Sequence, residues 1–409
     1  MSFDSGTFDI LALGFIISIS VIFKSVLKKV SIPSVLVFLG VGFILKVTHM
    51  YVPFLSEHLT SKIHFLGKMG VVVLLFDVGL KSDLKSLIHH LREATPIWLV
   101  GTLFAGLIGF AASFWLLKYE MIPSLFLATA FTATSVGITT AIWREKGVLK
   151  KPMGQLLVDV AELDDLSGVM LMGLLFSITP SILDGSLHTP SAIAGQLTMT
   201  SGWFFLKFLL FIVFCYSFSK FMRSFLSHFM TFHTNSIERT LIVFGISFVI
   251  AAIAGGLGLS LAIGAFFAGI VFANDEETVR NEYYFDEIRE FMTPFFFIAI
   301  SIQIEPELLK DGLYIGAIIL FFAFVSKVVP TGLVSWLSMP ASNSLLFGVS
   351  MVPRAEIALI IFEQGKQLGD SVVPDTLYTG MIIGVMGTTL LAPLFVYKLI
   401  DVVFPSQAD

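Results

Sequence analysis

Apolar segments long enough to cross a lipid bilayer recur along this chain, and they constrain its fold more than any other feature. A helix needs roughly 20 apolar residues to span the hydrocarbon core, and we count about thirteen segments of that length, or nearly so, in the 409 residues. They lie at 7–27, 31–50, 63–80, 94–117, 121–143, 152–179, 200–222, 237–255, 257–273, 290–304, 311–336, 344–365 and 374–400. Charged residues make up only 13% of the chain, against roughly 25% in soluble domains. The sequence therefore predicts an all-α polytopic membrane protein, a single integral domain over 1–409 surrounded by the lipid bilayer.

The positive charges predict how the chain is threaded through the membrane. Sixteen of the 25 Lys and Arg residues lie in or beside the loops that follow odd-numbered segments, and seven lie by the other loops. Because cytoplasmic loops carry the excess of Lys and Arg, we expect the N-terminus outside and the C-terminus in the cytoplasm. An odd number of spans then makes segments 1–6 and 8–13 two inverted six-helix repeats, joined by the linker helix at 200–222.

Two segments are interrupted by polar residues at matching positions of the two halves. The fifth contains ATAFTATSVGITT, which is polar from Thr132 to Thr140, and the twelfth contains GVSMVPRAEIALII, with Pro353, Arg354 and Glu356 in mid-span. Such interruptions free backbone amides and carbonyls, which must face protein or water rather than lipid. One interruption alone is typical of a kinked helix, but a matched pair indicates a transporter site near the middle of the bilayer.

Ionisable residues inside the predicted spans are few. A charge at the bilayer centre costs roughly 2.5–3.5 kcal/mol on insertion scales, so each needs a partner or a water-filled cavity. Three of them lie together in the stretch VAELDDLSGV of the sixth segment. The set consists of Asp77, Asp159, Glu162, Asp164, Asp165, Lys327, Arg354 and Glu356.

Asp164 and Asp165 are adjacent, so their side chains leave a helix about 100° apart and cannot serve one face. Lys327 is the only ammonium deep in a predicted span, and it can neutralise one of the two. The other must be protonated or must hold a cation. Competition between a proton and a monovalent cation for one carboxylate couples their movements, so the sequence indicates a cation/proton exchanger. A purely structural ion pair is the alternative.

The interrupted segments would complete the site. Hard cations prefer oxygen ligands, which Thr132, Thr134, Ser135 and the freed carbonyls would supply. Glu356 would neutralise the helix N-termini where the two interruptions meet. Arg354 would pair with a carboxylate or with carbonyls at the ends of the broken helices.

Three further acids have less specific roles. Asp77 lies near the cytoplasmic end of the third segment, where we expect a solvated or pathway-lining charge. Glu162 lies one turn before Asp165 and is either a third ligand or a vestibule acid. Asp159 is expected closer to the cytoplasmic end of its segment.

Six stretches occur in an order that resembles a known family. They are LLFDVGLKSDL, FTATSVGITTAIWREKGVL, the Asp-Asp of AELDDLSGV, GAFFAGIVFAN, FFFIAISIQIE and MVPRAEIALII. Over nearly its whole length the chain resembles the monovalent cation:proton antiporters, in the branch that contains NapA-like sodium/proton and Kef-like potassium/proton exchangers. The resemblance implies an NhaA/NapA-like fold with crossed discontinuous helices, and a homodimer in a prokaryotic inner or plasma membrane. It also implies a mobile core part at 94–179 and 311–400 and a dimerisation part at 1–90 and 237–304.

The resemblance also implies roles for single residues. Carried over by position, Asp165 resembles the carboxylate that binds cation and proton, and Asp164 resembles the neighbour that pairs with a lysine, here Lys327. Thr134 and Glu356 match the residues at the half-helix crossing. In this family an Asp-Asp pair with the lysine accompanies electrogenic sodium/proton exchange, whereas Gln-Asp is typical of Kef-like members. We therefore expect Na⁺, with Li⁺ as a further candidate, at Asp165.

Two positions depart from the family pattern, and other functions stay open. Ala355 replaces a common glycine, and Glu162 stands where an apolar residue is expected. Potassium in place of sodium is the first alternative, and a cation channel or signalling membrane protein is the second, although neither a filter repeat nor a sensor domain is visible. Protease, zinc-enzyme and ATPase patterns such as GxGD, HExxH and GxxxxGK[ST] are missing, so we expect no enzyme. We also expect no nucleotide-binding domain, no nucleic-acid partner and no cofactor apart from the transported ions.

Overall fold

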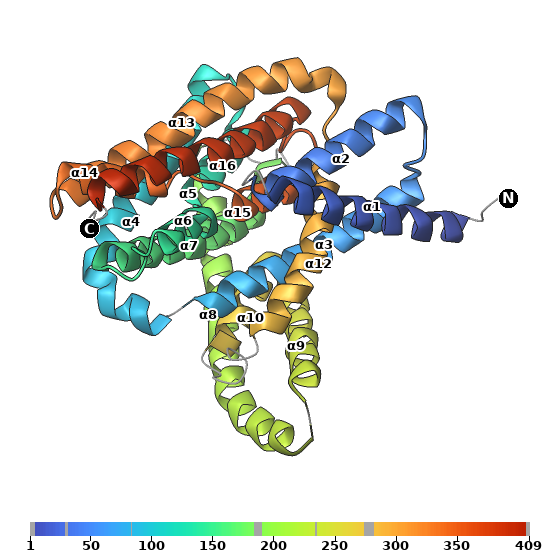
Figure 1. The fold of residues 1–409 in the computed structure, drawn as a ribbon, viewed down its shortest axis with the longest axis horizontal. Helices are drawn as coiled ribbons and strands as arrows, with labels where there is room; N and C mark the ends of the chain where they lie inside the picture. The colour runs from blue at the N-terminus through green and yellow to red at the C-terminus, as the bar shows by residue number, and fades with distance from the viewer. Residues whose placement is uncertain are drawn as a thin grey trace. The chain divides into compact units, whose positions relative to one another are not determined.

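The computed structural model describes residues 5–28, 32–82, 84–183, 190–233, 235–273 and 282–405, and within these ranges it contains helices and no strand. Figure 1 shows them coloured along the chain. In chain order they are α1 (Ser5–Lys28), α2 (Ser34–Tyr51), α3 (Glu57–Lys81), α4 (Leu84–Ala111), the π-helical turn η1 (Ala112–Leu116), α5 (Met121–Thr132), α6 (Val136–Glu145), α7 (Pro152–Leu183), α8 (Pro190–His233), α9 (Ser236–Gly256), α10 (Leu261–Ala273), α12 (Glu282–Ser301), the 3₁₀ turn η2 (Pro306–Leu308), α13 (Leu309–Trp336), α14 (Ala341–Ser350), α15 (Glu356–Lys366) and α16 (Asp375–Val403).

Each of the thirteen predicted segments corresponds to one helix or to a pair of half-helices. Only residue 31 of the predicted ranges lies outside the described residues. The two segments with polar interruptions are the two that are split, into α5 and α6 and into α14 and α15. Within the described ranges, nine spans are long and apolar enough to cross a membrane by length and composition. The prediction of an all-α polytopic fold is confirmed.

Some predicted boundaries were wrong because the end of an apolar run does not end a helix. Helix α12 begins at Glu282 rather than at 290, since its charged first turns carry Asp286 and Arg289, which pair with each other (Nη2–Oδ1 2.9 Å) and with α3. Helix α8 extends from Pro190 to His233, well beyond the predicted 200–222. Hydropathy marks the part of a helix that lipid can surround, whereas backbone hydrogen bonding continues past it.

The contacts divide the chain into two compact units. The first unit comprises Met1–His64, Lys85–Gly168 and Phe297–Asp409, and the second comprises Phe65–Leu84 and Val169–Phe296. Both broken segments and the Asp-Asp pair belong to the first unit. The units are defined by packing alone, so the division into a mobile core part and a dimerisation part stays a prediction.

Within the first unit, α13 and α16 lie side by side (Figure 1) and pack through glycines. The glycines recur every fourth residue, as Gly312 and Gly316 on α13 and as Gly380 and Gly384 on α16. A Cβ atom added to Gly316 would lie 2.6 Å from the Cγ2 atom of Ile383, too close for any larger side chain. Small residues at this spacing let two membrane helices approach closely. The packing matters for the site because α13 carries Lys327.

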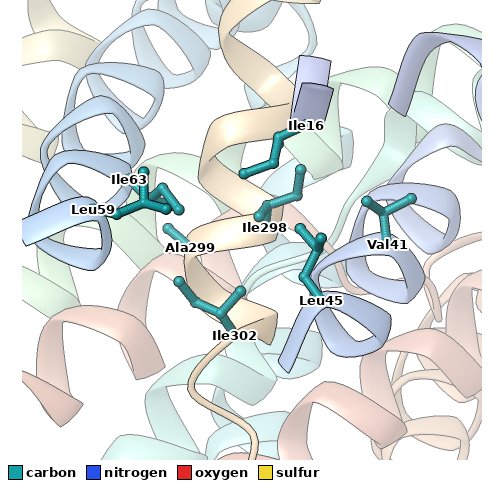
Figure 2. Packing of buried hydrophobic residues seen from close by; sticks show 8 residues of the cluster. All are labelled: Ile16, Val41, Leu45, Leu59, Ile63, Ile298, Ala299 and Ile302. Atoms are coloured by element: carbon teal, nitrogen blue, oxygen red, sulfur yellow. The ribbon is translucent and has the colours of Figure 1, made fainter. Parts of the chain in front are cut away.

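A second packing centre of the first unit surrounds the C-terminal end of α12. Figure 2 shows this apolar cluster, in which side chains of α1, α2 and α3 pack against α12. Its buried members are Ile16, Val41, Leu45, Leu59, Ile63, Ile298, Ala299 and Ile302. Gly42 of α2 allows the closest approach, since a Cβ atom there would lie 2.9 Å from the carbonyl oxygen of Ile298. The end of α12 is thus held on one side by apolar contacts.

Candidate functional site

The two breaks in the helices meet each other. The backbone N–H of Ser135 donates to the carbonyl of Pro353 (2.8 Å), and the hydroxyl of Thr139 donates to the carbonyl of Ser350 (3.1 Å). Ala133 and Ser135 have extended backbone angles, and Pro353 has no N–H to continue a helix. Each break thus satisfies backbone groups that the other has freed, as membrane depth requires.

Asp164 is fully buried and has three donors. Lys327, also fully buried, places its Nζ 2.5 Å from Oδ2, and the hydroxyls of Thr134 and Thr102 donate to Oδ2 (2.7 Å) and Oδ1 (2.8 Å). The Lys327 ammonium also donates to the carbonyl of Thr132 (3.1 Å), which the end of α5 leaves free. A buried charge is tolerated when it is paired and hydrogen-bonded in this way.

Asp165 lies next to this pair in a different environment. Its side chain is partly exposed, and no described residue donates a hydrogen bond to its carboxylate. Among the charged groups that act on it are the carboxylates of Asp164, Glu356 and Glu162 and the ammonium of Lys327. Three negative charges against one positive charge favour a cation or a proton at this carboxylate.

Glu356 and Ser135 connect the N-termini of two half-helices. Ser135 precedes α6 as its N-cap residue, and Glu356 is the first residue of α15. The Ser135 hydroxyl donates to the Glu356 carboxylate (2.9 Å). A carboxylate is favoured at helix N-termini, where the helix dipoles are positive.

Arg354 contacts carbonyl and hydroxyl oxygens rather than a carboxylate. It is buried, donates from Nη1 to the carbonyl of Ala133 (2.5 Å) and from Nη2 to the hydroxyl of Ser326 (3.2 Å), and lies over the ring of Phe131. The Ala133 carbonyl belongs to the C-cap residue of α5, one of the two kinds of partner that the sequence predicted. Ala355 does not have the positive φ that would require glycine.

The remaining predicted acids lie elsewhere on the same or other helices. Glu162 is half-buried on α7, and Asp159 on the same helix is buried. Asp77, expected to be solvated or to line the pathway, is buried rather than solvated. In the second unit Lys81 (2.9 Å) and Arg289 (3.3 Å) pair with it. Two cations therefore neutralise Asp77.

Three contributors were missed by the sequence analysis. Thr102 and Ser326 are neutral residues of apolar segments, and nothing in the sequence distinguishes them from other membrane hydroxyls. Glu363 is buried inside a predicted span, so the criterion of ionisable residues within spans would have found it. Among the described residues, no three His, Cys, Asp or Glu side chains gather as a resident metal site would need.

Comparisons with known proteins identify the family of this chain. Residues 15–399 match the family model described as sodium/hydrogen exchanger, transmembrane. The chain is 28% identical to the high-affinity Na⁺/H⁺ antiporter NhaS3 of Synechocystis sp., over 81% of this chain and 70% of the relative. It is 26% identical to a Na⁺/H⁺ antiporter of Enterococcus hirae, over 82% of this chain and 85% of that one.

A third relative and a solved structure extend the comparison. The K⁺/H⁺ antiporter subunit KhtU of Bacillus subtilis is 24% identical over 84% of this chain and 82% of its own. The fold is similar to that of the sodium proton antiporter MjNhaP1 of Methanocaldococcus jannaschii, with a TM-score of 0.68, 15% identity and coverage of 96% of this chain and 97% of that chain. These relatives are transporters rather than enzymes. The chain belongs to the sodium/hydrogen exchanger family of integral membrane proteins.

Proposed function

We propose that this protein exchanges Na⁺ for H⁺ across the membrane, with Li⁺ as a second candidate cargo, by binding either ion at Asp165. One observation carries the proposal. Lys327 and two hydroxyls already satisfy Asp164, whereas Asp165 is partly exposed, has no described donor and faces an excess of negative charge.

Competition at Asp165 supplies the coupling. A carboxylate that holds a proton cannot hold Na⁺, and a bound Na⁺ favours loss of the proton. If the protein exposes Asp165 to each face in turn, each passage carries one ion or the other, and the gradient of one drives the other. Thr132, Thr134, Ser135 and nearby carbonyls supply hard oxygen ligands for the cation.

The Asp164–Lys327 pair makes the exchange electrogenic in this proposal. Lys327 loses part of its counter-charge when a cation binds beside Asp164, which favours release of its proton. More than one proton then moves per Na⁺, so the cycle transfers net charge. The two carboxylates and the ammonium titrate as one coupled set, and no single step belongs to one residue.

Potassium in place of sodium is the alternative cargo. The K⁺/H⁺ name of the KhtU relative favours it, while the names of the two other relatives favour sodium. Na⁺ and K⁺ are both hard monovalent cations with oxygen ligands, so the choice depends on cavity size and ligand number. A channel or signalling role is less well supported, because the reported relatives are named antiporters.

The proposal includes the setting of the protein. The distribution of Lys and Arg supports an external N-terminus and a cytoplasmic C-terminus. A homodimer in a prokaryotic inner membrane, with 1–90 and 237–304 at the dimer interface, would serve pH homeostasis. Residues 94–179 and 311–400 would form the part that moves.

Proteoliposomes with an internal pH dye test the proposal. We expect external Na⁺ to move protons in the wild type, with a rate that depends on voltage, and expect Asp165→Asn to abolish the movement. Asp159→Asn, a buried carboxylate on the same helix, is the matched control and should retain exchange. Movement with K⁺ alone would select the potassium candidate. Unchanged exchange in Asp165→Asn would refute the assigned carboxylate and make Glu162 the next candidate.

A further inference from the structure

A buried polar cluster lies apart from the Asp-Asp pair, around Glu363 of α15. Gln303, just past the end of α12, donates from Nε2 to Oε2 of Glu363 (2.6 Å), and the hydroxyl of Tyr378 on α16 donates to the same oxygen (2.6 Å). The other oxygen accepts from Nε2 of Gln367 (3.1 Å) and faces Nδ1 of His64 on α3 (3.8 Å). Glu363 and Tyr378 are buried.

The composition of this cluster does not resemble that of a cation site. Donors surround both Glu363 oxygens, and a cation needs acceptor oxygens instead. The cluster thus connects helices through hydrogen bonds.

The connected helices differ in their relation to the site. Helix α15 begins with Glu356 at the meeting of the two breaks, and α16 holds the Arg354 backbone through Thr388 (3.3 Å) and Thr389 (3.0 Å). Helices α3 and α12 donate no described side chain to Asp164 or Asp165. The Glu363 cluster therefore joins helices that form the site to helices that do not.

The two sides of the α12 end are held by different kinds of contact. Toward α1, α2 and α3 it packs through the apolar cluster of Figure 2. Toward α15 and α16 it is held by hydrogen bonds, since Nε2 of Gln303 donates to Glu363 (2.6 Å) and lies 3.3 Å from the hydroxyl oxygen of Tyr378. Water can replace hydrogen bonds one for one, but parting an apolar contact exposes surface at roughly 25 cal/mol per Å². The polar side is the one suited to separate repeatedly.

We propose that the Glu363 cluster is a gate that closes the pathway at the membrane face where α15 ends and α16 begins. An exchanger that exposes its site alternately must break contacts at each face once per cycle. Opening this gate parts Glu363 and Tyr378 from Gln303 and His64 and admits water between them. The inference rests on the proposed alternating access. The distribution of Lys and Arg puts this gate at the outer face of the membrane.

A reversible cross-link tests the gate. The background is Cys215→Ala, which removes the single cysteine. Gln303→Cys with Glu363→Cys is bridged by a short bifunctional methanethiosulfonate. We expect Na⁺-driven proton movement to fall at least tenfold on bridging and to return when dithiothreitol cleaves the bridge. If the bridged protein transports as fast as the same protein after dithiothreitol has cleaved the bridge, the gate is refuted.

A matched pair controls for the bridge itself. Tyr119, which precedes α5, and Thr376 on α16 share a hydrogen bond (2.7 Å) at the same membrane face as the Glu363 cluster. Helices α5 and α16 both belong to the part of the protein that forms the site. Bridging Tyr119→Cys to Thr376→Cys should leave transport unchanged. A cysteine-free parent that moves no protons with any cation would refute the proposed function instead of the gate.

A single substitution gives a second readout that needs no cross-link. Glu363→Ala removes the acceptor that joins α12 to α15 and α16, so the closed gate loses hydrogen bonds to a charged group. We expect the apparent KM for Na⁺ at the gated face to fall by roughly tenfold. If Glu363→Ala lowers the thermal stability but keeps the wild-type KM for Na⁺ at both faces, the cluster is only structural.

Discussion

Replacing Lys327 by methionine isolates the interaction that best defines this site. The substitution keeps an unbranched side chain of similar length in α13 but removes the charge 2.5 Å from the Asp164 carboxylate. Both side chains are fully buried, so water cannot take the place of the ammonium. Two hydrogen bonds to Asp164 would remain, from Thr102 and Thr134.

The expected loss of stability can be worked from the charge left behind. Asp164 must stay ionised without its partner, which costs roughly 3–5 kcal/mol, or must take up a proton. Taking up a proton costs less free energy at low pH than at high pH, because protons are then more abundant. Protonation therefore limits the loss at each pH, and Lys327→Met should be destabilised more at high pH than at low pH.

Thermal unfolding in detergent, compared with the wild type at each pH, measures the effect. We expect the apparent Tm of Lys327→Met to fall by on the order of 5 °C at pH 7 and by less at pH 5. The double variant Lys327→Met with Asp164→Asn has no charge to neutralise, so its loss should be smaller and independent of pH. A loss in Lys327→Met that is the same at both pH values would refute the reasoning.

Two further substitutions test neighbouring contacts. Thr134→Val removes the hydroxyl that donates to Asp164, and we expect it to lower the free energy of unfolding by about 1–3 kcal/mol in the same unfolding assay. The control Thr129→Val removes a hydroxyl that bonds only its own helix and should cost less. Equal losses in the two variants would contradict the role of Thr134. Gly168 lies so close to the first break that an added Cβ atom would be 3.1 Å from Cβ of Ala133. Gly168→Val should therefore reduce cation-driven proton flux in proteoliposomes by roughly tenfold or more, and full flux would show that the crossing can shift to accept the side chain.

The breaks in the helices could be predicted because their causes are local. Pro353 has no N–H and disfavours helix in the residue before it, and a polar run from Thr132 cannot face lipid. The same reasoning placed the breaks in matching segments. That the two breaks meet is an expectation of the sequence analysis. The structure supplies the contact, a hydrogen bond from the N–H of Ser135 to the carbonyl of Pro353.

Asp77 shows where local reasoning fails. Its position near the end of a span suggested a solvated charge, but Lys81 and Arg289 make it part of a buried ion-pair cluster. Lys81 is four residues away and could have been suspected from helix geometry. Arg289 is more than 200 residues away, and no pattern within the third segment points to it.

The sequence by itself determined the class of this protein, the number of its spans, the two broken segments and the family. These follow from hydropathy and from motif order, which are read along the chain. Which of two adjacent carboxylates Lys327 pairs with could not be decided from the residues, and only the family resemblance named Asp164. The tertiary structure decided it, because Asp164 and Asp165 point about 100° apart on α7 and the packing of α13 brings an ammonium from 163 residues away to one of them.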